Sequence, residues 1–395
     1  MKWRRRKIAN LGRVVTGKTP ATSNREFFDG EYMFVTPSDI NYAHYFCRAT
    51  ESTVTDLARQ RYKNQFIPAG SVMFTCIGNT IGKCAIACSE CLTNQQINSV
   101  ITNKETDAKF IYYLLCNNVS LIKSLGGGAA TPIINKSTFQ NIEFSIPDAD
   151  EQRRIAEVLE AHDDLIDINS RRIGFLEAAA RQLYTEWFAR LHYPGHPRTR
   201  RITSLPKGWA RRPLGEVCAE VRDTAAPDEC EPDSPYIGLE HIPRRSIALC
   251  EWGRAEEVTS TKHRFRTGDI LFGKIRPYFH KVGVAFVDGV ASSDAIVLRP
   301  TAAEWHSLAL LTVSSDAFVA DASKTAREGS KMPRADWKLM RTRPVPVPPE
   351  TLLRTFNAQI EPIVSQLKTL TFQNRRLRTA RDLLLPRLMN GDINA

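Results

Sequence analysis

Two long stretches of the chain carry apolar side chains at intervals of seven residues. The first stretch starts at Asp148, an N-cap candidate followed three residues later by Glu151, and continues for about forty residues until Pro194-Gly195 stops it. A repeat of seven aligns side chains along one stripe of a helix. The stripe is built from two sets of positions, which are Ile155, His162, Asn169, Leu176 and Leu183, and Leu159, Ile166, Ile173, Ala180 and Trp187.

The second stretch repeats this pattern near the end of the chain and stops at Asn390-Gly391. Pro362 lies within it, and because proline removes one helical hydrogen bond, we expect a kink near the start of this helix. Its two sets of stripe positions are Phe356, Ile363, Leu370, Leu377 and Leu384, and Ile360, Leu367, Asn374, Arg381 and Leu388.

Two stripes of equal length, neither of which is buried by its own helix, predict an antiparallel intramolecular coiled coil. At about 1.5 Å per residue the paired helices are roughly 60 Å long. Polar residues in the stripe, His162, Asn169 and Asn374, are typical of positions that fix register and partner. The alternative is that two ordinary amphipathic helices pack on separate cores.

The chain also contains one unit twice. Residues 131–159 align without a gap to residues 332–360, so that Pro132 meets Pro333 and Pro147 meets Pro348. Upstream, GSVMFTCIGNTIGKCAIA from Gly70 pairs with GDILFGKIRPYFHKVGVA from Gly268, and VTPSDI resembles IGLEHI. The shared positions indicate a common scaffold, whereas the segments that differ are where the copies are free to bind different things.

Each copy opens with short β-like runs such as SVMFTCI, AIVL and VGVAFV and closes with one long helix. The sequence therefore predicts two tandem α+β domains joined by two long helices that form an antiparallel coiled coil with pseudo-twofold symmetry. The predicted boundaries are 1–149 for the first domain, 150–192 for the first long helix, 193–208 for a basic linker, 209–348 for the second domain and 349–391 for the second long helix.

The charge of the chain points to a polyanionic partner. A formal charge of +11 arises from 54 Lys and Arg against 43 Asp and Glu, and basic residues cluster before Ile8 and again between Arg198 and Arg212. Nine cysteines, an odd number, favour reduced thiols over a disulfide framework. The chain lacks a long apolar run and a signal core, so the sequence predicts a cytoplasmic protein.

The duplicated domain, with the helix start IPDADEQRRIAEVL, resembles the specificity (S) subunit of type I restriction-modification systems. LYTEWFARLHYPGH at 183–196, followed by LPKGW, is similar to the junction between first helix and second domain in that family, and GSVMFTCIGNTIGKCAI with TNQQI is similar to its domain core. The second helix start, VPPETLLRTF, departs from the family pattern because it lacks the Glu-Gln pair.

This resemblance implies a non-catalytic subunit with two target-recognition domains, each reading one half of a split, asymmetric sequence in double-stranded DNA. The partners that it implies are two methyltransferase subunits and restriction subunits, and it implies no cofactor held by the chain itself. The resemblance places the helix pair as the element that sets the gap between the half-sites.

Several residues are candidates for contact with DNA, because Asn and Gln pair with adenine, Arg with guanine, and Lys and Arg with phosphate. For Asn94 to Gln96 the alternative is that these side chains only satisfy a turn, and for any single surface Lys or Arg it is a solvated side chain. The candidates are Lys18, Thr19, Asn79, Thr80, Lys83, Asn94, Gln95, Gln96, Lys274, Arg276, Tyr278, His280, Lys281, Lys324, Arg327 and Lys331.

Two other functions are open on the sequence. Cys84, Cys88 and Cys91 have the C-x3-C-x2-C spacing of iron-sulfur enzymes that use S-adenosylmethionine. Against this, one strand would turn Cys84 and Cys88 to the same side, and the aligned residues in the second copy are apolar, which favours core packing. The other function is a coiled-coil adaptor without DNA binding. No phosphate-binding P-loop or metal-binding catalytic motif is present.

Overall fold

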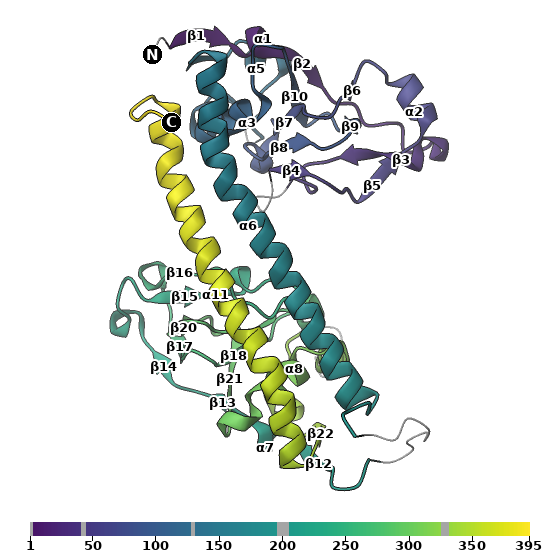
Figure 1. Ribbon diagram of the computed structural model, residues 1–395, viewed down its shortest axis with the longest axis vertical. Coiled ribbons are helices and arrows are strands. Elements are labelled where there is room, and N and C mark those ends of the chain that lie inside the picture. The colour runs from purple at the N-terminus through teal and green to yellow at the C-terminus, as the bar shows by residue number, and fades with distance from the viewer. Residues whose placement is uncertain (1–2, 41–44, 128–130, 196–204, 325–331) are drawn as a thin grey trace. The chain divides into compact units, whose positions relative to one another are not determined.

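The computed structural model of the protein describes residues 3–40, 45–127, 131–195, 205–324 and 332–395. The chain divides into two units. Unit 1 consists of Met1–Ile168 together with Arg376–Ala395, and unit 2 consists of Asn169–Arg375. Each unit therefore contains one α+β domain and a segment from each of two long helices, α6 (Ala149–Tyr184) and α11 (Glu350–Met389) (Figure 1).

The domain of unit 1 is built on two sheets. The larger sheet has the order β2-β10-β7-β8-β4, formed by Gly12–Thr16, Ile97–Thr102, Val72–Thr75, Cys84–Ala87 and Phe46–Cys47. The smaller sheet has the order β5-β3-β9-β6, formed by Ser52–Val54, Phe28–Val35, Cys91–Thr93 and Phe66–Ile67. The short helices of the domain are α1 (Ile8–Leu11), α2 (Asp56–Arg61), α3 (Ala108–Asn117), α4 (Val119–Ser124) and α5 (Lys136–Gln140).

The core of this domain lies where α3 and α5 cover β7 and β8. All side chains of β7 are buried, as expected for the run VMFT, which is mostly apolar and contains residues that favour β-strands. Phe74 of β7 stacks on Phe139 of α5 with ring centroids 5.6 Å apart. Asp107 accepts a hydrogen bond from Phe110 N at 2.8 Å and so begins α3.

The domain of unit 2 repeats this plan. One sheet has the order β13-β21-β18-β19, formed by Cys218–Val221, Ala295–Pro300, Ile270–Gly273 and Val282–Val284. The other has the order β14-β17-β20-β15-β16, formed by Thr224–Ala225, Lys262–Phe265, Gly289–Ala291, Pro235–Ile237 and Gly253–Arg254. Its short helices are α7 (Leu214–Val217), α8 (His306–Val313), α9 (Asp316–Lys324) and α10 (Trp337–Met340).

Strand register confirms the internal repeat. Val72 pairs with Ile86 in unit 1, and the aligned residues Ile270 and Val284 pair in unit 2. Each domain also has a two-stranded sheet immediately before its long helix, formed by β1 (Arg4–Lys7) with β11 (Glu143–Ile146) and by β12 (Ala210–Pro213) with β22 (Pro344–Val347). The α+β class and the two long helices predicted from the sequence are therefore correct.

Within each unit the two helix segments run antiparallel. In unit 2, Trp187 packs on Phe356 while Asn374 donates to Ser170, so residue numbers fall along one helix as they rise along the other. In unit 1, Asp163 pairs with Arg381, and Ile155 and Leu159 share a core with Leu388. The prediction of antiparallel pairing therefore holds inside each unit.

The ends of the long helices differ in part from expectation. Asp148 accepts a hydrogen bond from Glu151 N at 3.0 Å, which confirms it as the N-cap of α6. Helix α6 ends at Tyr184, where a single wider turn at Thr185–Ala189 follows. Helix α11 continues through Pro362, so the expected kink would lie within the helix and does not end it. No helix in the described residues is long and apolar enough to cross a membrane.

Candidate functional site

The turn between β7 and β8 contains the first group of candidate DNA contacts. Asn79 is exposed at its tip, between Gly78 and Gly82, which have φ angles of 67° and 105°. Thr80 is partly committed to the turn itself, because its hydroxyl donates to Ile77 O at 2.9 Å. Of this group, Asn79 has the side chain that is most accessible to a ligand.

Lys83 and Lys281 occupy equivalent positions and make equivalent internal contacts. The ammonium group of Lys83 donates to Pro37 O at 2.6 Å, and that of Lys281 donates to Leu239 O, the aligned carbonyl of the second domain. Burial, and next the charge of Arg244, lower the pKa of Lys281. Both lysines therefore join a loop to the adjacent sheet, a structural role that the sequence alone does not indicate.

The segments at Lys18 and at Asn94 lie together in unit 1. Thr19 donates a hydrogen bond to Gln95, and Lys18 N donates to Thr93 O at 2.8 Å. The side chain of Asn94 accepts a hydrogen bond from Gln96 N at 3.0 Å. It therefore stabilises its own turn, which was the alternative to a role in DNA binding. Lys18 and Gln95 are exposed, which leaves them as the accessible members of this group.

The turn between β18 and β19 contains the matching candidates of unit 2. Tyr278 is 55% exposed, and Arg276 is half-buried with its guanidinium 5.9 Å from the ring of Phe279. His280 is buried, and its Nε2 lies 2.8 Å from Ser314 O. A direct contact between His280 and a base is therefore inconsistent with its buried position.

The positions of the remaining candidates say less about a role in DNA binding. Lys274 is half-buried below the same turn, and its carbonyl accepts from Ala335 N. Lys324 is exposed at the end of α9, and its ammonium lies 3.3 Å from Asp321. Arg327 and Lys331 lie outside the described residues.

A groove in unit 2 contains basic residues that were not predicted from the sequence. Arg222, Lys274, Arg334 and Lys338 line it, with Trp337 beside them. Arg222 lies 2.7 Å from Glu220, and Arg334 lies 3.6 Å from Asp294. No motif in the sequence marks Arg222, which follows strand β13 (Cys218–Val221) and is brought to Lys274 and Arg334 only by the fold.

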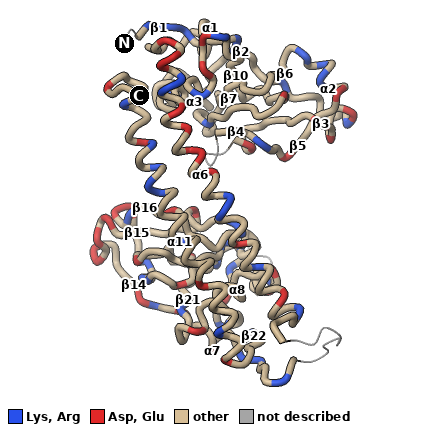
Figure 2. The backbone as a smooth tube through the Cα atoms, in the orientation of Figure 1, with Lys and Arg blue, Asp and Glu red and all other residues tan. Residues whose placement is uncertain are grey.

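Basic charge alone does not single out one surface. Lys and Arg positions are distributed over both units and alternate with acidic positions (Figure 2). The turns at Gly78–Lys83 and at Lys274–Lys281 are distinguished instead by their equivalent place on two equivalent sheets and by their different side chains. They are the best candidates for sites that bind different ligands on one scaffold.

The cysteine triplet does not form a metal site. Cys84 and Cys91 are buried, but strand β8 ends at Ala87 and Cys88 is exposed beyond it, so the expectation that Cys84 and Cys88 share one side of a strand was wrong. Burial raises the pKa of Cys91 to about 12, which disfavours the thiolate that a cluster needs. Among the described residues, no His, Cys, Asp or Glu side chains group as metal ligands.

The predicted stripe positions lie mainly between the helix segments of each unit. In unit 1, Ile155, Leu159 and Ile166 are buried, while His162, Leu377 and Leu384 are half-buried. Arg381 is also half-buried, and it faces Asp163. In unit 2 the buried positions are Asn169, Ile173, Ala180, Trp187, Phe356, Ile360, Leu367, Leu370 and Asn374, and the half-buried ones are Leu176, Leu183 and Ile363.

Comparison with known proteins gives one consistent result. The model of the type I restriction modification DNA specificity domain matches residues 1–178. The chain is 23% identical to the type I restriction enzyme MjaIX specificity subunit of Methanocaldococcus jannaschii, over 99% of this chain and 93% of that one. It is 24% identical to the EcoDI specificity subunit of Escherichia coli, over 100% of this chain and 89% of the relative.

The fold is also that of a solved relative. The S subunit of a type I restriction-modification system from M. genitalium superposes with a TM-score of 0.61 at 17% identity, covering 98% of this chain and 96% of that one. The fold of the chain is therefore that of this solved S subunit. Over nearly its whole length the chain is similar to type I restriction-modification specificity subunits, and its first 178 residues match their DNA specificity domain.

Proposed function

We propose that the protein reads a split, asymmetric sequence in double-stranded DNA and docks two methyltransferase subunits of a type I restriction-modification complex. Restriction subunits join the same complex, and the assembly acts in the cytoplasm. The chain itself supplies recognition and no catalytic group, and it needs no cofactor of its own. Each domain reads one half-site, and the helix pair sets the gap between them.

One observation carries this proposal. The turns Gly78–Lys83 and Lys274–Lys281 sit on sheets with identical strand register, yet they differ at almost every side chain. Equivalent scaffolds with unlike turns suit recognition of two unlike base sequences. Basic residues around them, such as Lys18 and Arg222, provide attraction to phosphates through release of counterions.

The proposal is tested by co-expressing the chain with the methyltransferase subunit encoded beside it and mapping methylated bases across genomic DNA. We expect one motif of two short, different half-sites separated by a fixed gap. A chain in which the first turn is replaced by the second should methylate a motif with changed bases in one half only. Methylation without a split motif, or a chain that forms the complex but gives none, would contradict the proposal.

The role of the helix pair has a separate test. Inserting seven residues into both long helices keeps the apolar stripe in phase, because the stripe repeats every seven residues. We expect the gap in the motif to lengthen while both half-sites stay the same. As a control, insertion into one helix alone breaks the pairing and should abolish methylation. An unchanged gap would show that the helix pair does not set the spacing.

Gel retardation separates the proposed function from a coiled-coil adaptor without DNA binding, which no comparison supports. The adaptor predicts that the purified complex does not retard DNA in a gel. The DNA-reading function predicts retardation that weakens steeply as salt rises, since binding releases counterions from phosphates.

A further inference from the structure

Two backbone positions in the turn of unit 2 carry side chains where the turn of unit 1 has glycine. The repeat aligns Arg276 with Gly78 and His280 with Gly82. All four residues have positive φ angles, 48° and 55° for Arg276 and His280, and 67° and 105° for the two glycines. Glycine adopts this left-handed conformation readily, whereas other residues do so at a cost in free energy. Strain of this kind persists where a side chain is needed for function.

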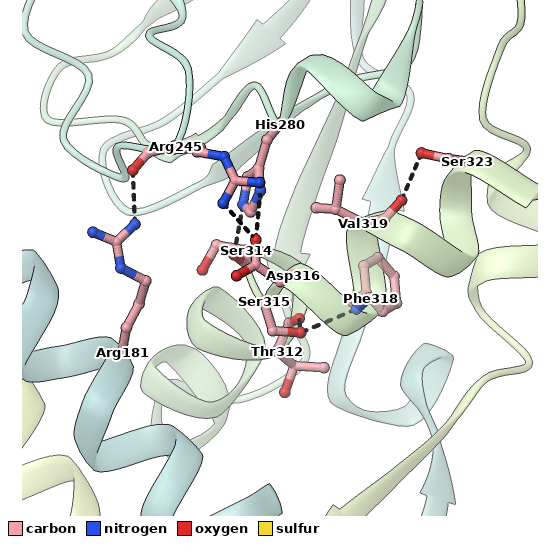
Figure 3. A network of polar contacts seen from close by, with 10 residues as sticks. All are labelled: Arg181, Arg245, His280, Thr312, Ser314, Ser315, Asp316, Phe318, Val319 and Ser323. Atoms are coloured by element: carbon pink, nitrogen blue, oxygen red, sulfur yellow. Dashed lines mark hydrogen bonds and ion pairs between the residues drawn. The ribbon is translucent and has the colours of Figure 1, made fainter. Parts of the chain in front are cut away.

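The side chain of His280 is buried in a site made for it. In unit 1 the corresponding space is filled by Val119, because a Cβ on Gly82 would lie 2.4 Å from Val119 Cγ1. In unit 2 the imidazole of His280 lies beside Ser314 and Asp316, at the start of α9 (Figure 3). Its Nε2 lies 2.8 Å from Ser314 O and its Nδ1 lies 3.3 Å from Asp316 Oδ1. Both partners are hydrogen-bond acceptors, and either ring nitrogen of a histidine can donate.

A second contact holds the backbone of His280. Arg245 N donates to His280 O at 2.9 Å, and the guanidinium of Arg245 lies 2.8 Å from Asp316 Oδ1. The carbonyl of Arg245 in turn accepts from Arg181 of α6 at 2.7 Å (Figure 3). The turn is thus tied through His280 and Arg245 both to the start of α9 and to the helix segment of the same unit.

Arg276 is a residue of this turn that is available to an external ligand. Its guanidinium faces the ring of Phe279, and no carboxylate among the described residues pairs with it. A guanidinium has a planar fork of donors that fits O6 and N7 of guanine. A cation that is held at a strained position without an internal counterion is therefore suited to an external acceptor.

From these observations we infer that Arg276 reads a guanine in the half-site of the second domain and that His280 is its positioning residue. His280 does not touch DNA. It holds the turn in the left-handed conformation that directs Arg276 outward, with Asp316 and Arg245 as its supports. This inference rests on the proposed function, since it names the base and the residues through which the second domain makes its choice.

The test uses the complex of the full chain with its methyltransferase subunits and a panel of duplexes in which each base pair of the second half-site is replaced in turn. We expect Arg276→Ala to lose discrimination at one G·C pair by about tenfold to a hundredfold. His280→Gly, which gives the turn the residue of unit 1, should lose discrimination at the same pair by a smaller factor. The double variant should lose no more than Arg276→Ala alone, because His280 acts through Arg276.

Three controls separate positioning from a general loss of structure. Preference within the first half-site should stay unchanged in every variant, which shows that the chain is folded and assembled. Asp316→Asn leaves His280 in place and should give a milder loss at the same base pair. Lys324→Ala changes an exposed cation on the same helix and should alter all duplexes alike, if it alters any.

The possible results separate a failure of this inference from a failure of the proposed function. If Arg276→Ala and His280→Gly change preference at different base pairs, or lower binding to all duplexes equally, the inference is wrong while the proposed function stands. If neither variant changes any preference although the wild-type motif is split, the inference is again wrong. If the wild-type complex yields no split motif, the proposed function itself fails.

Discussion

The two units hold their long helices by different chemistry. In unit 1 the domain meets a row of carboxylates on α6, where Tyr45 donates to Asp164 at 2.7 Å and to Glu160 at 3.1 Å, and Tyr113 donates to Asp163 at 2.7 Å. In unit 2 the buried carboxylate of Glu177 on α6 makes the corresponding contact, in addition to the hydrogen bond from Arg181 to Arg245 O. Glu177 accepts from Ser246 Oγ, Ile247 N and Ala248 N at 2.7, 2.8 and 3.0 Å.

The pairing of the helices differs in the same way. In unit 1 the buried Asp163 forms an ion pair with the half-buried Arg381, whereas the aligned residues of unit 2 are Val364 and Ala180. An ion pair between buried side chains adds little stability over an apolar pair, but it penalises any register that separates the charges. We conclude that unit 2 favours stability of the helix pair, while unit 1 favours one register of it.

The largest effect is expected for the carboxylate of unit 2. Glu177→Ala leaves two buried amide groups without an acceptor, so we expect the free energy of unfolding to fall by about 4 kcal/mol. Glu177→Gln keeps an acceptor oxygen and should cost about 1 kcal/mol. Tryptophan fluorescence during urea unfolding measures this, since every tryptophan except Trp3 lies in unit 2. Equal losses for both variants would mean that the charge, not the accepting oxygen, matters.

The second largest effect is expected for the ion pair of unit 1, between Asp163 and Arg381. Arg381→Ala leaves Asp163 buried without its cation, and we expect a loss of about 3 kcal/mol. Adding Asp163→Val reproduces the apolar pair of unit 2 and should recover part of this loss, with a coupling energy of about 1 to 3 kcal/mol. Hydrogen exchange of amides in α3 and in the unit 1 segment of α6 measures both variants. Strictly additive losses would contradict the comparison.

A smaller effect, with a distinct pH dependence, is expected for Tyr45→Phe. The lost hydrogen bonds should cost about 1 to 2 kcal/mol near pH 7. Burial, and next the hydrogen bond to Asp164, raise the pKa of Tyr45 well above its ordinary value, so the folded chain favours the neutral phenol. That contribution is complete below a pH of about 10 and is lost as the pH rises further.

Stability of the Tyr45→Phe variant should therefore fall less steeply than that of the wild type above a pH of about 10, measured by unfolding at a series of alkaline pH values. The aligned residue of unit 2 is Ile247, so Ile247→Val serves as a control that leaves the alkaline slope unchanged. A Tyr45→Phe variant with the wild-type slope would show that this phenol does not respond to pH in the folded chain.

The smallest effect is expected for Arg48→Ala. The side chain of Arg48 is 48% exposed and its Nη1 lies 3.0 Å from Asp167, so we expect a loss of about 0.5 kcal/mol at low salt. The difference from the wild type should shrink at high ionic strength, because salt screens the charge of the half-exposed Arg48 even though Asp167 is buried. Melting temperatures at low and high salt measure this, and a loss that persists in salt would point to packing instead.

The sequence revealed the scaffold because repetition and periodicity are local signals. The seven-residue stripe located both long helices, and the alignment of Gly70 with Gly268 located equivalent strands. It did not reveal the attachment of the domains to the helices. Glu177 looks like any exposed helical glutamate in sequence, since its partners, two backbone amides about 70 residues away, depend on tertiary structure.

The location of the candidate site could be predicted from the sequence, but the role of each residue in it could not. The turn at Lys274–Lys281 was found because it aligns with Gly78–Lys83. His280 and Lys281 were predicted as ligands, whereas both point inward, because a turn of a few residues gives no periodicity that separates inner from outer side chains. Only the backbone angles show why glycine in one copy corresponds to Arg276 and His280 in the other.

The composition of unit 1 has a consequence for folding. Its core includes Leu388 and Met389 together with residues as early as Ile8. Unit 2 is one continuous segment, Asn169–Arg375, so its core closes without residues from outside that segment. Unit 1 joins two segments that lie on either side of unit 2 in the sequence, so closing its core also closes a long loop of chain and costs additional conformational entropy.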